Sequence, residues 1–332
     1  MTPSGSRNAA RRVPPTGDLD TLTTLICGSF AYDTIMVFPD SFRNHILPEQ
    51  VHILNVCFMV PEMRREFGGC AGNIACNLHM LGGDALPMGT VGHDFGPYRE
   101  WLARQGIRDD HVTELPDTYT AQAFITTDMD DNQITAFHPG AMSLAHHNHV
   151  RDVPGIDLGI VSPDGRDAML QHAREFAERS VPFVFDPGQG LPMFDGEELD
   201  DFIDAAEWVV VNDYESRLLQ EKTGHSLEAI ASRVAALVVT RGAEGSVVHA
   251  AGDVIDIPAV TADDPVDPTG CGDAFRGGML YGLAQGFDWP TTGRIASLMG
   301  SIKIASHGTQ NHSVTPAEFA ERFREEFGYS YA

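Results

Sequence analysis

Residues 267–275 read Asp267-Pro268-Thr269-Gly270-Cys271-Gly272-Asp273-Ala274-Phe275, and a long helical pattern starts within this stretch. Gly270 and Gly272 allow the backbone to come close to a ligand. The free N–H groups of the first helical turn would converge on one point, where the helix dipole favours an anion. Asp273 lies in the same turn and can accept a proton from a hydroxyl group. An anion site beside a base is typical of phosphoryl transfer, and a simple helix cap is the alternative role for Asp273.

A pair of polar side chains follows the apolar run 208–211, which predicts a buried strand. Asn212 and Glu215 leave the end of this strand three residues apart, so they share one face of the helix that starts there. Their amide and carboxylate oxygens are suitable ligands for Mg²⁺ or for its bound waters. A capping box at the helix start is the alternative interpretation of the same two residues.

The next predicted strand, 236–240, ends at Thr240 and is followed by Gly242 and Gly245. A hydroxyl group next to a flexible glycine loop suits a triphosphate, and a simple hairpin turn is the alternative. Because ligands of α/β sheets bind outside the carboxyl ends of the strands, we expect this loop to lie in the same site as the helix start.

A second glycine-rich helix start reads Phe67-Gly68-Gly69-Cys70-Ala71-Gly72-Asn73. The neighbours of Gly69 and Asn73 are uncharged, so a sugar hydroxyl is the expected ligand rather than a phosphate. Asp33 follows the first predicted strand and could accept hydrogen bonds from two adjacent hydroxyl groups.

The fold class follows from the order of the elements. From about residue 156 onward, short apolar strands alternate with helical patterns, which predicts a mostly parallel central sheet flanked by helices. Extended segments at about 34–66 and 119–139 interrupt this order. They include predicted strands at 51–54 and 57–60, and a hairpin at 120–138. We interpret both segments as insertions that form a small β-sheet lid on an α/β domain.

The first 23 residues are polar, rich in Pro, Gly, Arg and Ser, and lack the apolar stretch of a signal peptide. We interpret 1–23 as a disordered leader and 24–332 as one α/β domain that carries the two inserted segments. The five cysteines form no C-x-x-C pair, which favours reduced thiols in a cytoplasmic protein and argues against a zinc site. No apolar run approaches the roughly 20 residues that span a bilayer.

The charge balance limits the partners. There are 47 acidic and 22 basic residues, which gives a net charge of −25. Such a surface repels nucleic acid and anionic membranes, so neither is an expected partner. The expected partner is a small molecule. Adaptation to high salt is one explanation of the acidity, because salt screens the repulsion, and an ordinary solvated surface is the other.

Several other phosphate and catalytic motifs are absent from the sequence. Neither lysine, Lys222 or Lys303, follows a glycine, so there is no Walker loop. Neither lies in the V-A-I-K context of protein kinases. The pair Gly270 and Gly272 lacks the third small residue of a dinucleotide fingerprint, and no G-x-S-x-G hydrolase elbow occurs.

Taken together, the order of the motifs resembles the ribokinase family, also called the PfkB carbohydrate kinases. Gly-Gly…Asn is followed by N-x-x-E, T-x-G-x-x-G and D-x-T-G-x-G-D, from about residue 25 to the C-terminus. The resemblance implies a large α/β domain with a β lid, and ATP and Mg²⁺ as requirements. It also implies specific roles for the residues above: Asp273 as the catalytic base, the backbone of Gly270, Cys271 and Gly272 as an anion hole, Asn212 and Glu215 for Mg²⁺ and the ATP phosphates, Thr240, Gly242 and Gly245 for the nucleotide, and Asp33, Gly69 and Asn73 for the sugar hydroxyls.

Two positions depart from the family pattern. Cys271 stands where Ala is usual, which spares a backbone role. Pro268 follows Asp267 and could alter the monovalent-cation site that some members build there, so activation by K⁺ stays open.

Within the family, the stretch 137–142 and the sequence Gly308-Thr309-Gln310 look most like bacterial and archaeal adenosine (nucleoside) kinases. We therefore expect transfer of the γ-phosphate of ATP to the 5′-hydroxyl of a purine nucleoside. A sugar kinase of the same family, acting on ribose or fructose, is the alternative. A non-catalytic nucleotide sensor is the alternative of another class. Both a monomer and a homodimer are compatible with a lid of this kind.

Overall fold

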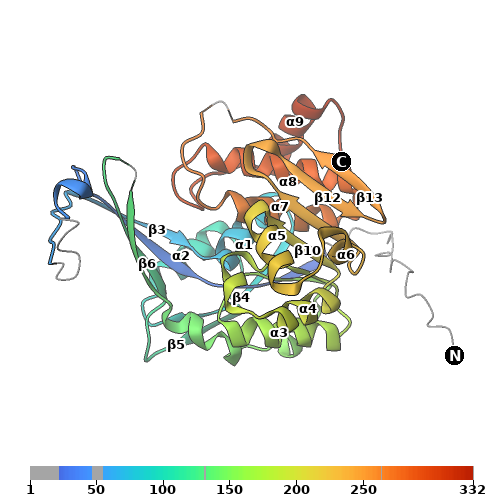
Figure 1. The fold of residues 1–332 in the computed structure, drawn as a ribbon, viewed down its shortest axis with the longest axis horizontal. Helices are drawn as coiled ribbons and strands as arrows, with labels where there is room; N and C mark the ends of the chain where they lie inside the picture. The colour runs from blue at the N-terminus through green and yellow to red at the C-terminus, as the bar shows by residue number, and fades with distance from the viewer. Residues whose placement is uncertain (1–21, 47–54, 131, 263, 332) are drawn as a thin grey trace.

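Within residues 22–46, 55–130, 132–262 and 264–331, which the computed structural model describes, the strands form one sheet of nine strands and one of four (Figure 1). The strands are β1 (Thr23–Cys27), β2 (Ala31–Val37), β3 (Glu62–Gly68), β4 (Asp84–Gly92), β5 (His111–Leu115), β6 (Ala121–Thr127), β7 (Gln133–His138), β8 (Leu158–Val161), β9 (Phe183–Phe185), β10 (Trp208–Asn212), β11 (Ala236–Thr240), β12 (Ser246–Ala250) and β13 (Asp253–Ile257). The helices are α1 (Cys70–Met80), α2 (Gly96–Gln105), α3 (Arg166–Glu178), α4 (Gly196–Ala205), α5 (Asp213–Thr223), α6 (Leu227–Ala231), α7 (Cys271–Ala284), α8 (Trp289–Ile304) and α9 (Pro316–Phe327).

The large sheet has the order β13-β12-β11-β10-β9-β8-β1-β4-β5. All its neighbours are parallel except the pairs that involve β12 and β13, which are antiparallel. The expected mostly parallel sheet flanked by helices, with a small second sheet, is confirmed.

Both faces of the large sheet are buried, because its apolar side chains alternate between two cores. Val209 and Val211 of β10 pack in the same core as Phe202 of α4. Val210 points the other way, into the core that contains Met279 of α7. In Figure 1, α3 and α4 lie on one side of the sheet and α1, α7 and α8 on the other. This alternation with period two explains why near-continuous apolar strands occur here.

The four-stranded sheet has the order β3-β2-β6-β7 and extends away from the large sheet (Figure 1). Its strands come from the two segments predicted to form a lid, although β2 already begins at Ala31 and β3 continues to Gly68. The hairpin predicted over 120–138 is formed by β6 and β7. All residues of β7 are exposed, so this sheet leaves one edge uncovered.

One strand of this sheet was predicted at the wrong place. No strand forms at 57–60, where Phe58 instead packs its ring against Phe38 and Phe42, with ring centroids 4.7 and 5.0 Å apart. The strand is Glu62–Gly68, which pairs with β2 and carries exposed charged side chains, as edge strands do. The strand predicted at 51–54 lies outside the described residues.

The strands predicted at 208–211 and 236–240 are β10 and β11, and their boundaries agree to within one residue. The central domain begins with β1 at Thr23, one residue before the predicted start, and the leader interpreted over 1–23 lies almost wholly outside the described residues. The helical pattern predicted to start within 267–275 is α7. Across the described chain, we find no helix with the length and apolar character of a membrane span.

Candidate active site

The carboxyl ends of β9, β10 and β11 meet the start of α7 around a cavity of about 360 Å³. These elements contribute polar side chains to its wall, among them Asp186, Asn212, Glu215, Thr240, Asp273 and Arg276. Open parallel sheets bind ligands at this edge. The structure therefore brings together three of the predicted motifs, although they are far apart in the sequence.

The start of α7 depends on a glycine with a left-handed backbone. Gly270 has φ of 80°, and a Cβ atom there would lie 2.9 Å from the Thr309 side chain. The loop before it is fixed by Asp267, whose carboxylate accepts hydrogen bonds of 2.9 Å from the backbone N–H groups of Thr269 and Gly308. The first N–H groups of α7 are thus held towards the cavity, where they can bind an anion.

Cys271 and Gly272 form the first turn of α7, and both line a second cavity beside the first. Burial raises the pKa of the Cys271 thiol, so the side chain is neutral and does not repel an anion. A Cβ atom at Gly272 would lie 3.3 Å from the Arg276 guanidinium, so a larger residue would crowd this side chain.

Asp273 accepts a hydrogen bond of 2.7 Å from the Asn73 amide of α1. Burial raises the pKa of Asp273 to about 6, while the hydrogen bond from Asn73 lowers it. Nearby Asp186 raises this pKa further and Arg276 lowers it. A carboxyl group with this pKa is ionised at neutral pH and is still basic enough to take a proton from a hydroxyl.

The positive charge at the cavity is that of Arg276, which forms a buried ion pair with Asp186. Arg276 lies one turn after Asp273 and donates two hydrogen bonds, of 3.0 and 2.9 Å, to the Asp186 carboxylate. Burial lowers the pKa of Arg276, but Asp186, Glu215 and Asp273 outweigh it and raise the pKa overall, so the guanidinium stays charged. Neither Arg276 nor Asp186 was predicted as a site residue. The spacing of Arg276 from Asp273 on one helix face was the available signal.

Asn212 and Glu215 form the capping box that was the alternative interpretation. The Glu215 N–H donates to Asn212 Oδ1, and Glu215 Oε2 accepts from the Asn212 N–H, both at 2.8 Å. Both residues still line the cavity, and burial raises the pKa of Glu215. Among the described residues, no group of three or more His, Cys, Asp or Glu side chains could hold a metal ion. The Asn212 amide and the Glu215 carboxylate are the oxygen groups at this wall that could bind Mg²⁺ or its waters.

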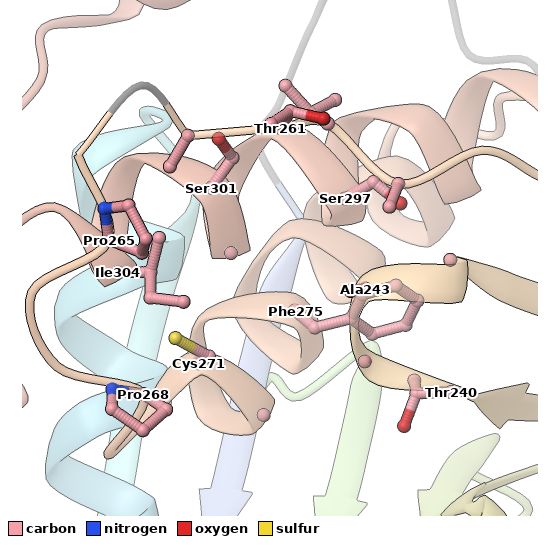
Figure 2. A pocket seen from close by; sticks show the side chains of 17 residues that line it. Thr240, Ala243, Thr261, Pro265, Pro268, Cys271, Phe275, Ser297, Ser301 and Ile304 are labelled. Atoms are coloured by element: carbon pink, nitrogen blue, oxygen red, sulfur yellow. The ribbon is translucent and has the colours of Figure 1, made fainter.

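The second cavity, of about 560 Å³, shares Thr240, Gly242 and Gly272 with the first, so the two are continuous. Figure 2 shows that Ala243, Cys271, Phe275 and Ile304 lie around it. Its wall is mostly apolar, and its volume is within the range of ligand pockets.

The loop beside this cavity has backbone conformations that favour glycine at two positions. Gly242 and Gly245 have φ of 55° and 85°. A Cβ atom at Gly245 would lie 2.2 Å from the Ile257 carbonyl oxygen. The predicted nucleotide loop thus forms one wall of a cavity that is continuous with the anion site.

The three residues predicted to hold hydroxyl groups approach from the side of the small sheet. Asn73 is buried and contacts Asp273 directly. Gly69 has φ of 89°, where only glycine fits because a Cβ atom would lie 2.5 Å from the Ser29 carbonyl. Asp33 of β2 lies next to the start of α1, since a Cβ atom on Gly68 would be 2.6 Å from its carboxylate. Burial raises the pKa of Asp33 to about 6.

Comparison with known proteins places this site in a family context. The model of the pfkB family of carbohydrate kinases matches residues 42–316. The nucleoside kinase of Methanocaldococcus jannaschii is 30% identical over 272 residues, which are 81% of this chain and 89% of that protein.

Solved structures of nucleoside kinases are also similar to this chain. The Burkholderia thailandensis nucleoside kinase in complex with inosine has 55% sequence identity and a TM-score of 0.85, over 93% of this chain and 99% of that chain. The same nucleoside kinase in complex with ADP-inosine has 57% identity and a TM-score of 0.83, over 93% of this chain and 97% of that chain. The match to the family model and these similarities cover most of the chain, and the protein belongs to the pfkB family of carbohydrate kinases.

Proposed function

We propose that this protein is an ATP-dependent kinase that phosphorylates the 5′-hydroxyl of a purine nucleoside. The observation that carries the proposal is the position of Asp273 in the first turn of α7, beside the N–H groups of the anion site and Arg276. A base and an anion site within one helical turn are what phosphoryl transfer to a hydroxyl requires.

The proposed reaction proceeds in one displacement. As the 5′-oxygen attacks the γ-phosphorus, its proton passes to the Asp273 carboxylate, and the bond from phosphorus to the bridging oxygen breaks to release ADP. The N–H groups at the start of α7 and the charged Arg276 stabilise the negative charge that develops on the transferred group. Asn73 keeps Asp273 oriented through its 2.7 Å hydrogen bond.

The cavities fit ATP and Mg²⁺. The larger, apolar cavity suits the adenine ring, and the triphosphate would extend past Thr240 and Gly242 to the start of α7. Glu215 and Asp186 would hold the waters of Mg²⁺, which supplies charge neutralisation on the phosphates.

We propose that turnover does not need K⁺. The buried Lys303 ammonium donates hydrogen bonds of 2.6 and 3.3 Å to the carbonyl oxygens of Asp267 and Ser306. A cation is therefore already present next to the phosphate loop.

The cysteines bear on where the protein acts. All five are free in the structure, which is consistent with action in the cytoplasm, where thiols stay reduced.

An exposed ring on the small sheet favours a nucleoside over a free sugar. Asp33 is paired with Ala123, which is paired with Phe137, so the three side chains share one face of this sheet. Phe137 is 51% exposed. If Asp33 holds the ribose hydroxyls, Phe137 can cover the base. The similarity to two nucleoside kinases supports the same acceptor.

The test is ADP release from ATP and Mg²⁺ against a panel of acceptors: inosine, guanosine, adenosine, cytidine, ribose, fructose and fructose 6-phosphate. We expect turnover with purine nucleosides and a much smaller kcat/KM with free sugars. Phe137→Ala should raise KM for the nucleoside more than for ribose. Turnover confined to sugars would contradict the proposed acceptor, and ATP binding without turnover on any acceptor would point to a nucleotide sensor.

A further inference from the structure

A buried glutamine connects the proposed base to two aromatic side chains. Gln310 is 3% exposed and lies between α1 and α2. Its Nε2 donates hydrogen bonds of 2.8 Å to Asn73 Oδ1 and of 2.5 Å to Tyr98 Oη. Its Oε1 accepts from the Trp101 indole at 3.0 Å. Both ends of this amide are therefore in use, and Asn73 passes the contact on to Asp273.

The direction of these hydrogen bonds is fixed by chemistry at both outer ends. The indole N–H of Trp101 can only donate, so Gln310 must present its oxygen there. The hydroxyl of Tyr98 donates to the Gly68 carbonyl at 2.9 Å, so its oxygen is left to accept from Gln310. Burial raises the pKa of Tyr98 well above its ordinary value, which keeps this proton in place. Two independent contacts thus set the same orientation of the Gln310 amide.

The orientation of Gln310 determines that of Asn73. Because Gln310 donates, Asn73 must present its oxygen to Gln310 and its NH₂ group to Asp273. We propose that Gln310 is a positioning residue that turns the Asn73 amide so that a donor faces the Asp273 carboxylate. This inference rests on the proposed function only for its catalytic meaning, since the orientation itself follows from the four side chains.

The consequence is that the Asp273 carboxylate stays ionised although it is buried. A donor that faces a carboxylate stabilises the charged form, and an acceptor in the same place destabilises it. The other groups that act on Asp273 are Cys70 of α1, Asp186 after β9, and Arg276 on α7 itself. No hydrogen bond of Gln310 reaches any of these three, so its effect should pass through Asn73.

Two substitutions of Gln310 separate the effect of the orientation of the Asn73 amide from the effect of an added negative charge. Gln310→Glu has the same shape and still accepts from Trp101, but its carboxylate cannot donate, so Asn73 would turn its oxygen towards Asp273. Gln310→Met is neutral and of similar length, so it releases Asn73 without adding a charge. Cys76→Ser is the control, because Cys76 also donates to Gln310 Oε1, at 3.3 Å, and serine keeps a donor there.

The experiment is a ¹³C NMR titration of aspartate carboxyl carbons in the full-length protein, with the Asp273 signal assigned by its loss in Asp273→Asn. We expect Gln310→Glu to move the midpoint at least about one pH unit upward, a tenfold change in proton affinity. Gln310→Met should move it upward by less, and Cys76→Ser should leave it unchanged. An unchanged midpoint in Gln310→Met would overturn the inference, even if Gln310→Glu failed to fold.

The pH dependence of kcat/KM, measured on the same variants, separates this inference from the proposed function. If the kinetic midpoint moves with the NMR midpoint, both hold. If the NMR midpoint moves and the kinetic midpoint does not, the positioning role of Gln310 stands and Asp273 is not the base.

Discussion

Asp273 combines burial, which raises its pKa to about 6, with a donated hydrogen bond from Asn73, which lowers it. At the scale of single residues, Asp273 could be proposed as the base from the sequence, because it lies within one helical turn of the glycine loop. Arg276 and Gln310 were not predicted as site residues. Their partners, Asp186 and Asn73, lie 90 and 237 residues away, and only the fold shows that they meet.

The two raised carboxyl groups predict the pH dependence. Burial raises the pKa of both Asp273 and Asp33 to about 6, and both must be ionised to accept hydrogen bonds from the substrate. Activity should therefore be present above pH 6 and be lost as the pH falls through it. At saturating ATP, log kcat/KM should fall with a slope between about one and two. Asp33→Asn should leave a slope of one, and a wild-type midpoint near pH 4 would contradict this account.

At the scale of elements, the C-terminal end of α8 and the loop before α7 form one unit next to the anion site. Loop and helix are joined by Lys303, whose pKa is lowered by burial while Asp267 opposes the change. Other elements were missed in the sequence although their start signals were present. Helices α4 and α9 begin with capping boxes, Asp195 with Glu198 and Thr315 with Glu318. The strand β3 was predicted at the wrong place because its exposed charged residues lack the alternation of apolar and polar residues that indicates a strand.

Lys303→Met tests the connection between α8 and the phosphate loop. Loss of the buried ammonium removes its hydrogen bonds to the carbonyl oxygens of Asp267 and Ser306, at a cost of about 2 kcal/mol in unfolding free energy. We expect a lower Tm and a KM for ATP raised by about tenfold, with an unchanged KM for the nucleoside. Wild-type turnover should be equal in KCl and NaCl. The variant, in contrast, should recover part of its activity in NH₄Cl. An unchanged KM for ATP would contradict the role of Lys303.

Asp164, which follows β8, predicts a second dependence on pH. Burial raises the pKa of Asp164 to about 8, and Oδ2 has no hydrogen-bond partner among the described residues. In the folded protein the group keeps its proton up to about pH 8, whereas in the unfolded chain it ionises at its ordinary pKa near 4, so stability falls as pH rises between these values.

Asp164→Asn removes this penalty and keeps the hydrogen bond from the Gly165 N–H. We expect the variant to have a higher Tm than wild type at pH 8 and the same Tm near pH 4. Asp201→Asn, at an exposed position of α4, removes the same formal charge and serves as the control. A Tm difference for Asp164→Asn that is equal at both pH values would contradict the assignment.

At the scale of the whole molecule, the parallel sheet could be predicted because its strands bury both faces, so that apolar runs such as 208–211 stand out in the sequence. The order of the strands and the contact between the small sheet and α1 could not, since they depend on long-range pairing. The net charge of −25 is also a property of the whole chain, because 47 acidic residues outnumber 22 basic ones.

This excess charge predicts stabilisation by salt. Self-repulsion acts over the Debye length, which shrinks from about 10 Å at 0.1 M to about 3 Å at 1 M salt. The Tm should therefore rise steadily from low to molar KCl, and by more than the Tm of a control protein with little net charge. An equal rise in both proteins would mean that repulsion does not limit the stability of this fold.

The central claim is that Asp273 takes the proton of the acceptor hydroxyl, and Asp273→Asn tests it most directly. Asparagine keeps the shape and can still accept from Asn73, but it cannot act as a base. Turnover of wild type and variant should be compared with inosine and saturating ATP, and inosine binding should be measured by calorimetry. We expect kcat to fall by about 10³-fold or more, while the Kd for inosine stays within about threefold of wild type. A variant that turns over at close to the wild-type rate would contradict the account.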